Sequence, residues 1–141
     1  MRYLTYEDFD FIVNLFNTYP KPLKITFCVR EEKDMHYLIG TFDALFGPDV
    51  KKHQSSWSCH YYQNPTGSII HIYNGLNCNM AWINRSNIMV IDSEYPAIDM
   101  EEIWTPLCNW PPVIGVYHFN SKSFWSDYEH EMLLKSRGIK E

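Results

Sequence analysis

The chain has 141 residues, which suits one domain with one hydrophobic core. Hydrophobic residues make up 45% and charged residues 21% of the sequence, a balance that excludes a disordered chain and a coiled coil. Twelve Lys and Arg against 17 Asp and Glu leave a net charge of −5, the wrong sign for a protein that holds nucleic acid by neutralising phosphates.

The first predicted element is a helix that starts after Thr5. Thr5 and Asp8 have the spacing of a capping box, and the apolar residues that follow recur on one helical face. Because Pro20 and Pro22 force an extended turn, the helix ends before them. Residues 23–29 then alternate apolar and polar side chains, which predicts a first strand.

The next stretch predicts a charged turn followed by two short elements. Residues 30–34 carry the charges, and residues 35–40 are predicted as a second strand. Residues 42–46 have the composition of a single helical turn that ends at Gly47 and Pro48.

A β-hairpin is predicted in the middle of the chain. Aromatic residues alternate over 56–63, residues 64–67 read Asn-Pro-Thr-Gly, and a β-rich run covers 68–73. Further turns lead into runs at 78–83 and 88–91. We therefore expect a meander of short antiparallel strands.

The C-terminal part predicts a short helix at 98–107, a last strand at 113–119 and a closing helix at 126–137. Ser126 and Glu129 have the spacing of a capping box for that helix. The sequence shows none of the long crossovers that a parallel sheet needs. The prediction is a single α+β domain over residues 1–141, an antiparallel β-meander with an N-terminal and a C-terminal helix packed on the sheet.

The motifs of common enzymes and metal proteins are missing from the sequence. It holds no G-x-S-x-G elbow, no glycine-rich phosphate loop and no C-x-x-C pair. The cysteines sit beside apolar or aromatic residues, where a reduced thiol behaves as a small core residue: Cys28, Cys59, Cys78 and Cys108. We therefore expect no cofactor, no metal and no enzymatic activity.

Charge placement is the most informative feature. Between Arg85 and Lys122 the sequence has no Lys or Arg, yet it holds five acids there, interleaved with large aromatic residues. Acids together with aromatics favour a surface that binds a basic protein partner. The alternative is a solvated acidic loop whose aromatics face the core. The predicted partner-binding residues are Asp92, Glu94, Tyr95, Asp99, Glu101, Glu102 and Trp104.

The histidines support an alternative of another class. His60 and His71 flank the hairpin turn and His118 lies on the last predicted strand, so the three could line a pocket on one face of the sheet. Such a site would suit a small enzyme or a ligand-binding domain, since three histidines can hold a catalytic zinc. Cys59 and His60 cannot form a dyad, because neighbours on a strand point to opposite faces.

In size, in its helix opening Tyr-Glu-Asp-Phe at residues 6–9, in its α+β order and in its acidic segment 92–102, the chain resembles a group of small bacterial proteins. These are the acidic immunity proteins that bacteria encode beside contact-dependent growth inhibition or other polymorphic toxins. The resemblance implies a cytoplasmic antitoxin that binds one cognate toxin domain, often a basic nuclease, and blocks its active site or docking surface.

The other expectations about location and partners come from the residues. No stretch approaches the roughly 20 apolar residues that span a bilayer, and acids fill the N-terminal stretch where a signal peptide needs basic residues. We therefore expect a cytoplasmic protein without membrane or direct nucleic-acid contacts. A phage-encoded inhibitor of a host defence enzyme would use the same physics, and a homo-oligomer stays open.

Overall fold

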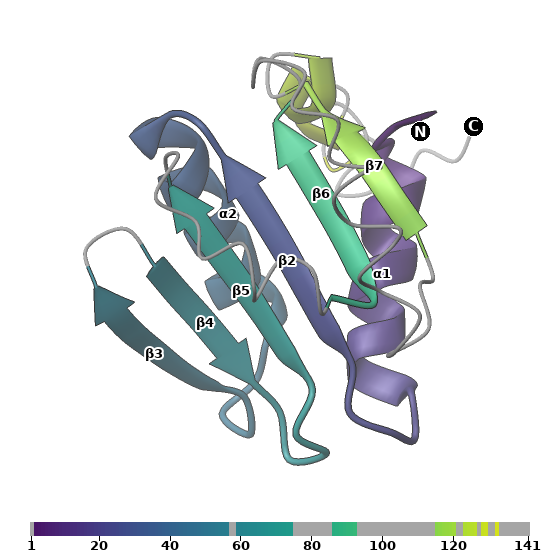
Figure 1. Cartoon of the computed structure of the whole chain (residues 1–141), viewed down its shortest axis with the longest axis vertical. Coiled ribbons are helices and arrows are strands. Elements are labelled where there is room, and N and C mark those ends of the chain that lie inside the picture. Colours follow the sequence, from purple (N-terminus) through teal and green to yellow (C-terminus); the bar gives the residue numbers. More distant parts are fainter. Residues whose placement is uncertain are drawn as a thin grey trace.

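The fold is built on one sheet of seven strands, of which Figure 1 gives the arrangement. The computed structural model describes residues 2–56, 59–74, 86–92, 115–120, 123–126, 128, 129 and 132. In chain order the elements are β1 (Arg2–Tyr3), α1 (Tyr6–Thr18), β2 (Lys24–Val29), α2 (Glu32–Leu45), β3 (Lys51–Ser56), β4 (Cys59–Gln63), β5 (Ile69–Asn74), β6 (Ile88–Asp92) and β7 (Gly115–Phe119).

The sheet is mixed, and its strand order is β1-β7-β6-β2-β5-β4-β3. The pairs β1–β7, β7–β6, β6–β2 and β2–β5 are parallel, and only β5–β4 and β4–β3 are antiparallel. The predicted α+β class is confirmed, but the purely antiparallel meander is wrong, because β2 lies between β5 and β6. Strands β2 and β6 are buried on both faces, which is the property of strands inside a parallel sheet.

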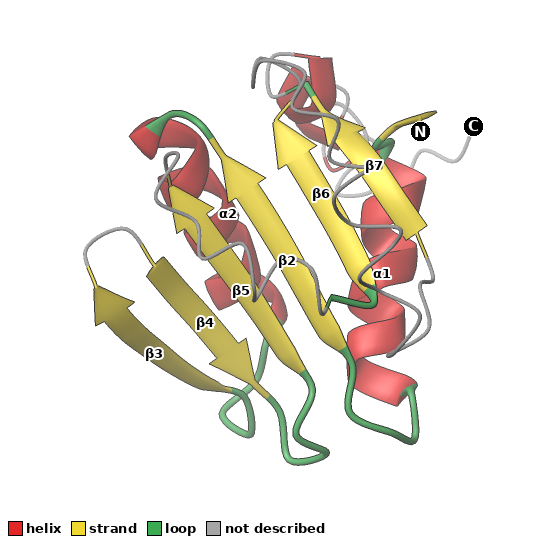
Figure 2. Cartoon of the chain, in the orientation of Figure 1, coloured by secondary structure: helices red, strands yellow, loops and turns green. Residues whose placement is uncertain are grey.

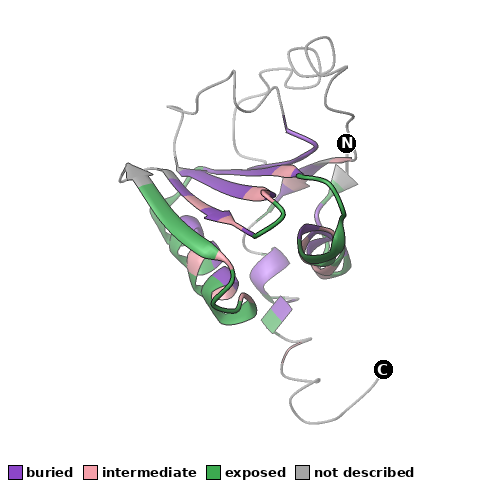
Figure 3. Cartoon of the chain, turned by 90° about the horizontal axis from the view of Figure 1, so that it is seen from below, coloured by how far each residue is buried: buried purple, intermediate pink, exposed green. Residues whose placement is uncertain are grey.

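The helices cover one face of the sheet, as Figure 3 shows edge-on and Figure 2 by element type. Phe9 of α1 stacks on Phe42 of α2 with 5.5 Å between ring centroids, and both contact Phe27 of β2. Phe124, from the helical residues after β7, packs edge-on against Phe9. Helices from both ends of the chain therefore share one core, and burial of each such ring stabilises the fold by about 1.5–3 kcal/mol.

The predicted N-terminal helix is confirmed together with its cap. The N–H of Asp8 donates to Oγ1 of Thr5 at 3.1 Å, and Oδ2 of Asp8 accepts from the N–H of Thr5 at 3.0 Å. These bonds satisfy two backbone donors that a helix start would otherwise leave without partners. The helix ends at Thr18, directly before the extended Tyr19.

The predicted strand at 35–40 is wrong, because these residues belong to α2. Met35, Leu38 and Phe42 are buried, and their spacing of three and four residues repeats on one helical face. Tyr37 lies between them and is exposed. The predicted end of the helical turn is close to the observed one, since α2 ends at Leu45.

The predicted hairpin is confirmed as β4 and β5, which pair antiparallel. The side chain of Asn64 orders its turn: Nδ2 donates to the carbonyl of Phe16 at 2.6 Å and Oδ1 accepts from the N–H of Ser68 at 2.9 Å. Gly67 has a φ of 95°, a conformation that other residues seldom adopt. Strand β3 was not predicted from the sequence.

The last strand is confirmed as β7, and the helical residues begin before the predicted start of the closing helix. Oδ1 of Asn120 accepts from the N–H of Ser123, and the carbonyl of Asn120 accepts from the N–H of Phe124. Asn120 thus caps this segment, and Ser126 is already helical, so the capping box predicted at Ser126 is wrong. The strand predicted at 78–83 and the helix predicted at 98–107 lie outside the described residues.

Candidate functional site

The carboxyl ends of the parallel strands form one edge of the sheet, which we call the carboxyl edge; the arrow tips of β2, β6 and β7 mark it in Figure 1. In open sheets of this kind, ligands bind at the carboxyl edge. They bind beside the strand at which the connections leave toward opposite sides of the sheet. Here that strand is β2, which pairs in parallel with both β5 and β6. The N–H of Arg30, just after β2, donates to Oδ2 of Asp92 at the end of β6 over 3.4 Å.

Strand β2 runs almost directly into α2, whose start is acidic. Glu31 is the N-cap residue and makes no side-chain cap, and Glu32 and Asp34 lie in the first turn. Nζ of Lys33 forms an ion pair of 3.4 Å with Glu31, and Nε2 of His36 lies 3.4 Å from Oε1 of Glu32, but such exposed contacts contribute at most about 1 kcal/mol. A helix N-terminus usually attracts anions, and carboxylates at this one repel a phosphate.

An exposed aromatic ring lies one turn further along α2. The Tyr37 side chain is 52% exposed, and its ring packs against that of Trp125 with 5.4 Å between centroids. Trp125 in turn contacts Phe119, which is opposite Asp92 in the β6–β7 register. The carboxyl edge therefore combines exposed carboxylates with an aromatic ring on a rigid support, the composition of a protein-binding surface.

The structure describes one of the seven predicted partner-binding residues. Asp92 is only 6% exposed, and it shares a face of β6 with Ile88 and Val90, which belong to the core. Its carboxylate therefore anchors the strand end and is not presented on the surface. The others lie outside the described residues: Glu94, Tyr95, Asp99, Glu101, Glu102 and Trp104.

The three histidines of the alternative hypothesis do not meet. His60 pairs with Ile72, a residue of the helix-covered core. His71 and His118 lie on the other face, because they pair with Tyr61 and Ile91, and β2 and β6 separate their strands. Three strand spacings correspond to about 14 Å. Within the described part of the chain no group of three or more His, Cys, Asp or Glu could hold a metal ion.

Burial shifts the titration of two of these histidines. Burial and the charge of Lys24 lower the pKa of His71 to about 4. Burial also lowers the pKa of His60, with smaller contributions from Lys52 and His36. Both imidazoles are consequently neutral at pH 7.

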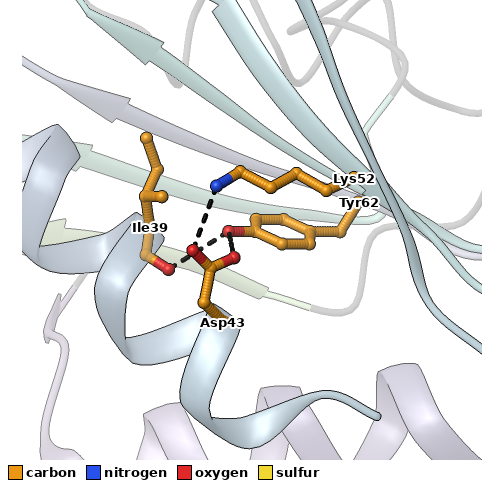
Figure 4. Close-up of polar contacts among 4 residues, drawn as sticks. All are labelled: Ile39, Asp43, Lys52 and Tyr62. Carbon is orange, nitrogen blue, oxygen red and sulfur yellow. Dashed lines mark hydrogen bonds and ion pairs between the residues drawn. The ribbon is translucent and has the colours of Figure 1, made fainter. Parts of the chain in front are cut away.

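A second polar cluster joins α2 to the antiparallel strands (Figure 4). The phenol of Tyr62 donates to Oδ1 of Asp43 at 2.7 Å and lies 3.1 Å from the carbonyl of Ile39, and Nζ of Lys52 lies 3.0 Å from Oδ2 of Asp43. Burial, together with the hydrogen bond and charge of Asp43, raises the pKa of Tyr62 well above its usual range. Desolvation alone would raise the pKa of Asp43, but Tyr62 and Lys52 hold it below its usual value. The Tyr62 phenol thus stays protonated, and its hydrogen bonds to Ile39 and Asp43 hold α2 against β4.

A hollow of about 340 Å³ lies at the opposite end of the sheet, beside the β4–β5 turn. The described residues that line it come from α1, the α2–β3 connection and that turn, and Asp49 is the one ionisable residue among these described residues. A single carboxylate provides no acid–base pair.

Comparison with known proteins gives a fold and no family. No protein-family model matches the chain, and no curated protein matches it. Among solved structures, the large terminase of a thermophilic bacteriophage is similar, with a TM-score of 0.51 at 11% identity. The match covers 93% of this chain and 34% of the terminase chain, so this chain spans about a third of that protein's length. At this identity the likeness shows a shared fold alone. None of the described helices is long and apolar enough to cross a membrane.

The contributions of Arg30, Tyr37 and Trp125 to the carboxyl edge were not predicted from the sequence. The signal for Tyr37 was present, because helical spacing of Met35, Leu38 and Phe42 leaves it on the outer face. The contacts of Arg30 and Trp125 join residues far apart in the chain, and no local pattern predicts them.

Proposed function

We propose that this chain is a non-enzymatic protein-binding inhibitor, an immunity protein that neutralises a cognate basic, nuclease-like toxin domain in the cytoplasm. Its binding surface would combine the acidic aromatic segment 92–104 with the start of α2. The partner's cations would be drawn to the carboxylates, and the aromatic rings would supply the buried contacts that keep the complex together.

The observation that carries this proposal is that the acid-rich interval of the sequence begins at a strand end joined by a hydrogen bond to the residue before the acidic start of α2. The acid-rich interval of the sequence begins at Asp92, the last residue of β6. The adjacent strand β2 leads into Glu31 and Glu32, both exposed, and the Arg30–Asp92 hydrogen bond joins the two strand ends. A binding surface that combined these acids would attract a basic partner over a longer distance than scattered acids would.

The aromatic component has support of its own. Tyr37 is exposed although its ring is held against Trp125, so little side-chain entropy would be lost when a partner covers it. Interfaces concentrate their binding energy in such aromatic residues. The acidic first turn of α2 also favours a cationic partner over a phosphate ligand.

The test begins with affinity purification from the native host at low and then at high salt, which identifies the partner by mass spectrometry. Its association rate is then measured with the wild-type chain and with Glu101→Lys/Glu102→Lys. We expect association to slow about tenfold or more and to depend less on salt, because the steering field is reversed.

A matched pair of single variants distinguishes the effect of the proposed binding surface on association from the effect of net charge alone. Glu32→Lys and Asp49→Lys change the net charge equally, but Asp49 lines the hollow at the opposite end of the sheet. Glu32→Lys should slow association several-fold and Asp49→Lys less than about twofold. Equal slowing by both variants, or a wild-type rate for the double variant, would refute the proposed surface.

A further inference from the structure

Strand β3 is an edge strand with an exposed side. It occupies one end of the sheet order, and β4 is its partner among the described strands. All four side chains from Lys51 to Gln54 are exposed. The opposite edge, β1, is only two residues long. An edge strand presents backbone N–H and C=O groups that can pair with another extended segment.

Contacts on both faces hold β3 in place. On the helix-covered face Lys52 reaches Asp43, which Tyr62 also holds (Figure 4). On the other face the ring of His53 stacks on that of Tyr61, with 4.7 Å between centroids and 15° between planes. Because the strand is ordered before any partner arrives, strand addition would cost little conformational entropy on this side.

The cationic side chain left for a partner, that of Lys51, lies on one face of β3. Lys51 and His53 are two residues apart and share the face away from the helices. Lys52 points to the other face and is engaged by Asp43. Lys51 forms no ion pair with any residue of the described part of the chain. Lysines on an edge repel basic strands and discourage indiscriminate pairing, so an acidic strand is the one that this edge admits.

We infer that the β3 edge binds an extended acidic segment of another protein as an additional strand, with carboxylates at alternate positions facing Lys51 and His53. The pairing window covers Lys51–Gln54, because the register shifts between Gln54 and Ser56. This surface is separate from the carboxyl edge and of opposite charge, so the inference does not rest on the proposed function.

The probe is a capped hexapeptide with Asp at its second and fourth positions and Thr elsewhere, titrated into the full chain. The backbone amide signals of residues 51–54 are followed by NMR, and we expect saturable shifts there with a Kd of the order of 1 mM. The same peptide with Asn in place of Asp should bind at least several-fold more weakly, since it keeps the β-propensity but loses the charge.

Matched variants of the chain complete the test. Lys51→Glu should weaken binding about tenfold, whereas Lys21→Glu, an exposed lysine outside β3, should leave it within about twofold. Unchanged β4 and β5 signals show that Lys51→Glu is folded. The inference is overturned by absence of shifts at 51–54 up to about 10 mM peptide, by equal binding of the Asn peptide, or by equal weakening in both variants. Glu32→Lys should not affect the peptide, so failure here and failure of the proposed function are separate results.

Discussion

Two carboxylates, Asp92 at the carboxyl edge and Asp43 beside β3, show how differently the two regions use charge. Asp92 is 6% exposed and accepts a backbone N–H, while the Asp43 side chain is 46% exposed and is held by side chains. At the carboxyl edge the buried carboxylate secures the strands and exposed acids remain for a partner. Beside β3, Asp43 fixes the strand through its contacts with Lys52 and Tyr62. Lys51 and His53 remain available to a partner.

Phe42→Ala should break both regions at once, since Phe42 fixes α2 to the core through Phe9, Phe27 and Tyr62. Loss of a fully buried ring lowers the free energy of unfolding by about 3–5 kcal/mol. Urea denaturation measures it. Tyr37→Ala on the same helix should cost less than about 1 kcal/mol, and comparable losses in the two variants would contradict the packing described for α2.

Asp92→Ala and Asp43→Ala test the comparison directly. Removal of the buried Asp92 carboxylate leaves the Arg30 N–H without its acceptor, and we expect a loss of about 2–3 kcal/mol. Asp43→Ala should cost about 1 kcal/mol, because water replaces part of what Lys52 and Tyr62 lose. The free energies of unfolding come from the same urea titration, and a reversed order would show that exposure does not separate the two carboxylates.

The pH dependence of stability tests the buried His71, whose strand β5 lies between the carboxyl edge of β2 and the β3 edge. Because the folded pKa of His71 is about 4 and that of an unfolded histidine about 6.5, protonation favours the unfolded chain. The part of stability that depends on His71 is fully present above about pH 6.5 and falls by about 3 kcal/mol as the pH drops toward 4. His71→Gln should reduce that slope. Thermal denaturation at several pH values measures the slope. Parallel pH profiles for wild type and His71→Gln would show that the loss of stability at low pH does not come from His71.

The smallest expected effect belongs to the exposed ion pair between Lys52 and Asp43. Lys52→Met removes the ion pair with Asp43 but keeps the aliphatic stem, and we expect a loss below about 1 kcal/mol. The difference from wild type should shrink further at high salt. A loss as large as that of Asp92→Ala would mean that Lys52 is more deeply involved in packing than its exposure indicates.

Local signals predicted much of the fold. The capping box at Thr5 and the Asn64–Gly67 turn each act within a few residues, so α1 and the β4–β5 hairpin followed from the sequence. The parallel pairing of β2 with β6 did not, since its contacts join residues about sixty positions apart. The unbroken apolar run at 88–91 was the overlooked sign of a strand buried on both faces, and strand β3 gave no apolar alternation to detect.

The candidate sites were predicted less well for the same reason. Asp92 was predicted as a partner-binding residue directly after the run at 88–91, but it is the last residue of β6, and its burial depends on neighbours that the sequence does not place beside it. Tyr37 was assigned to a strand and therefore overlooked as an exposed aromatic. The separation of His60 from His71 and His118 depends on register and strand order, which residue types alone do not determine.

The central place of β2 has a consequence for how the protein is made. Leu23 hydrogen-bonds to Ser68, 45 residues later, and Lys24 to Asn87, 63 residues later. A ribosome therefore releases α1, β2 and α2 well before β5 and β6 exist to flank β2. Folding waits for these late strands, as expected for a topology rich in distant contacts. A chain truncated before residue 86 would lack one neighbour of its own central strand, and we expect such nascent fragments to need protection from aggregation.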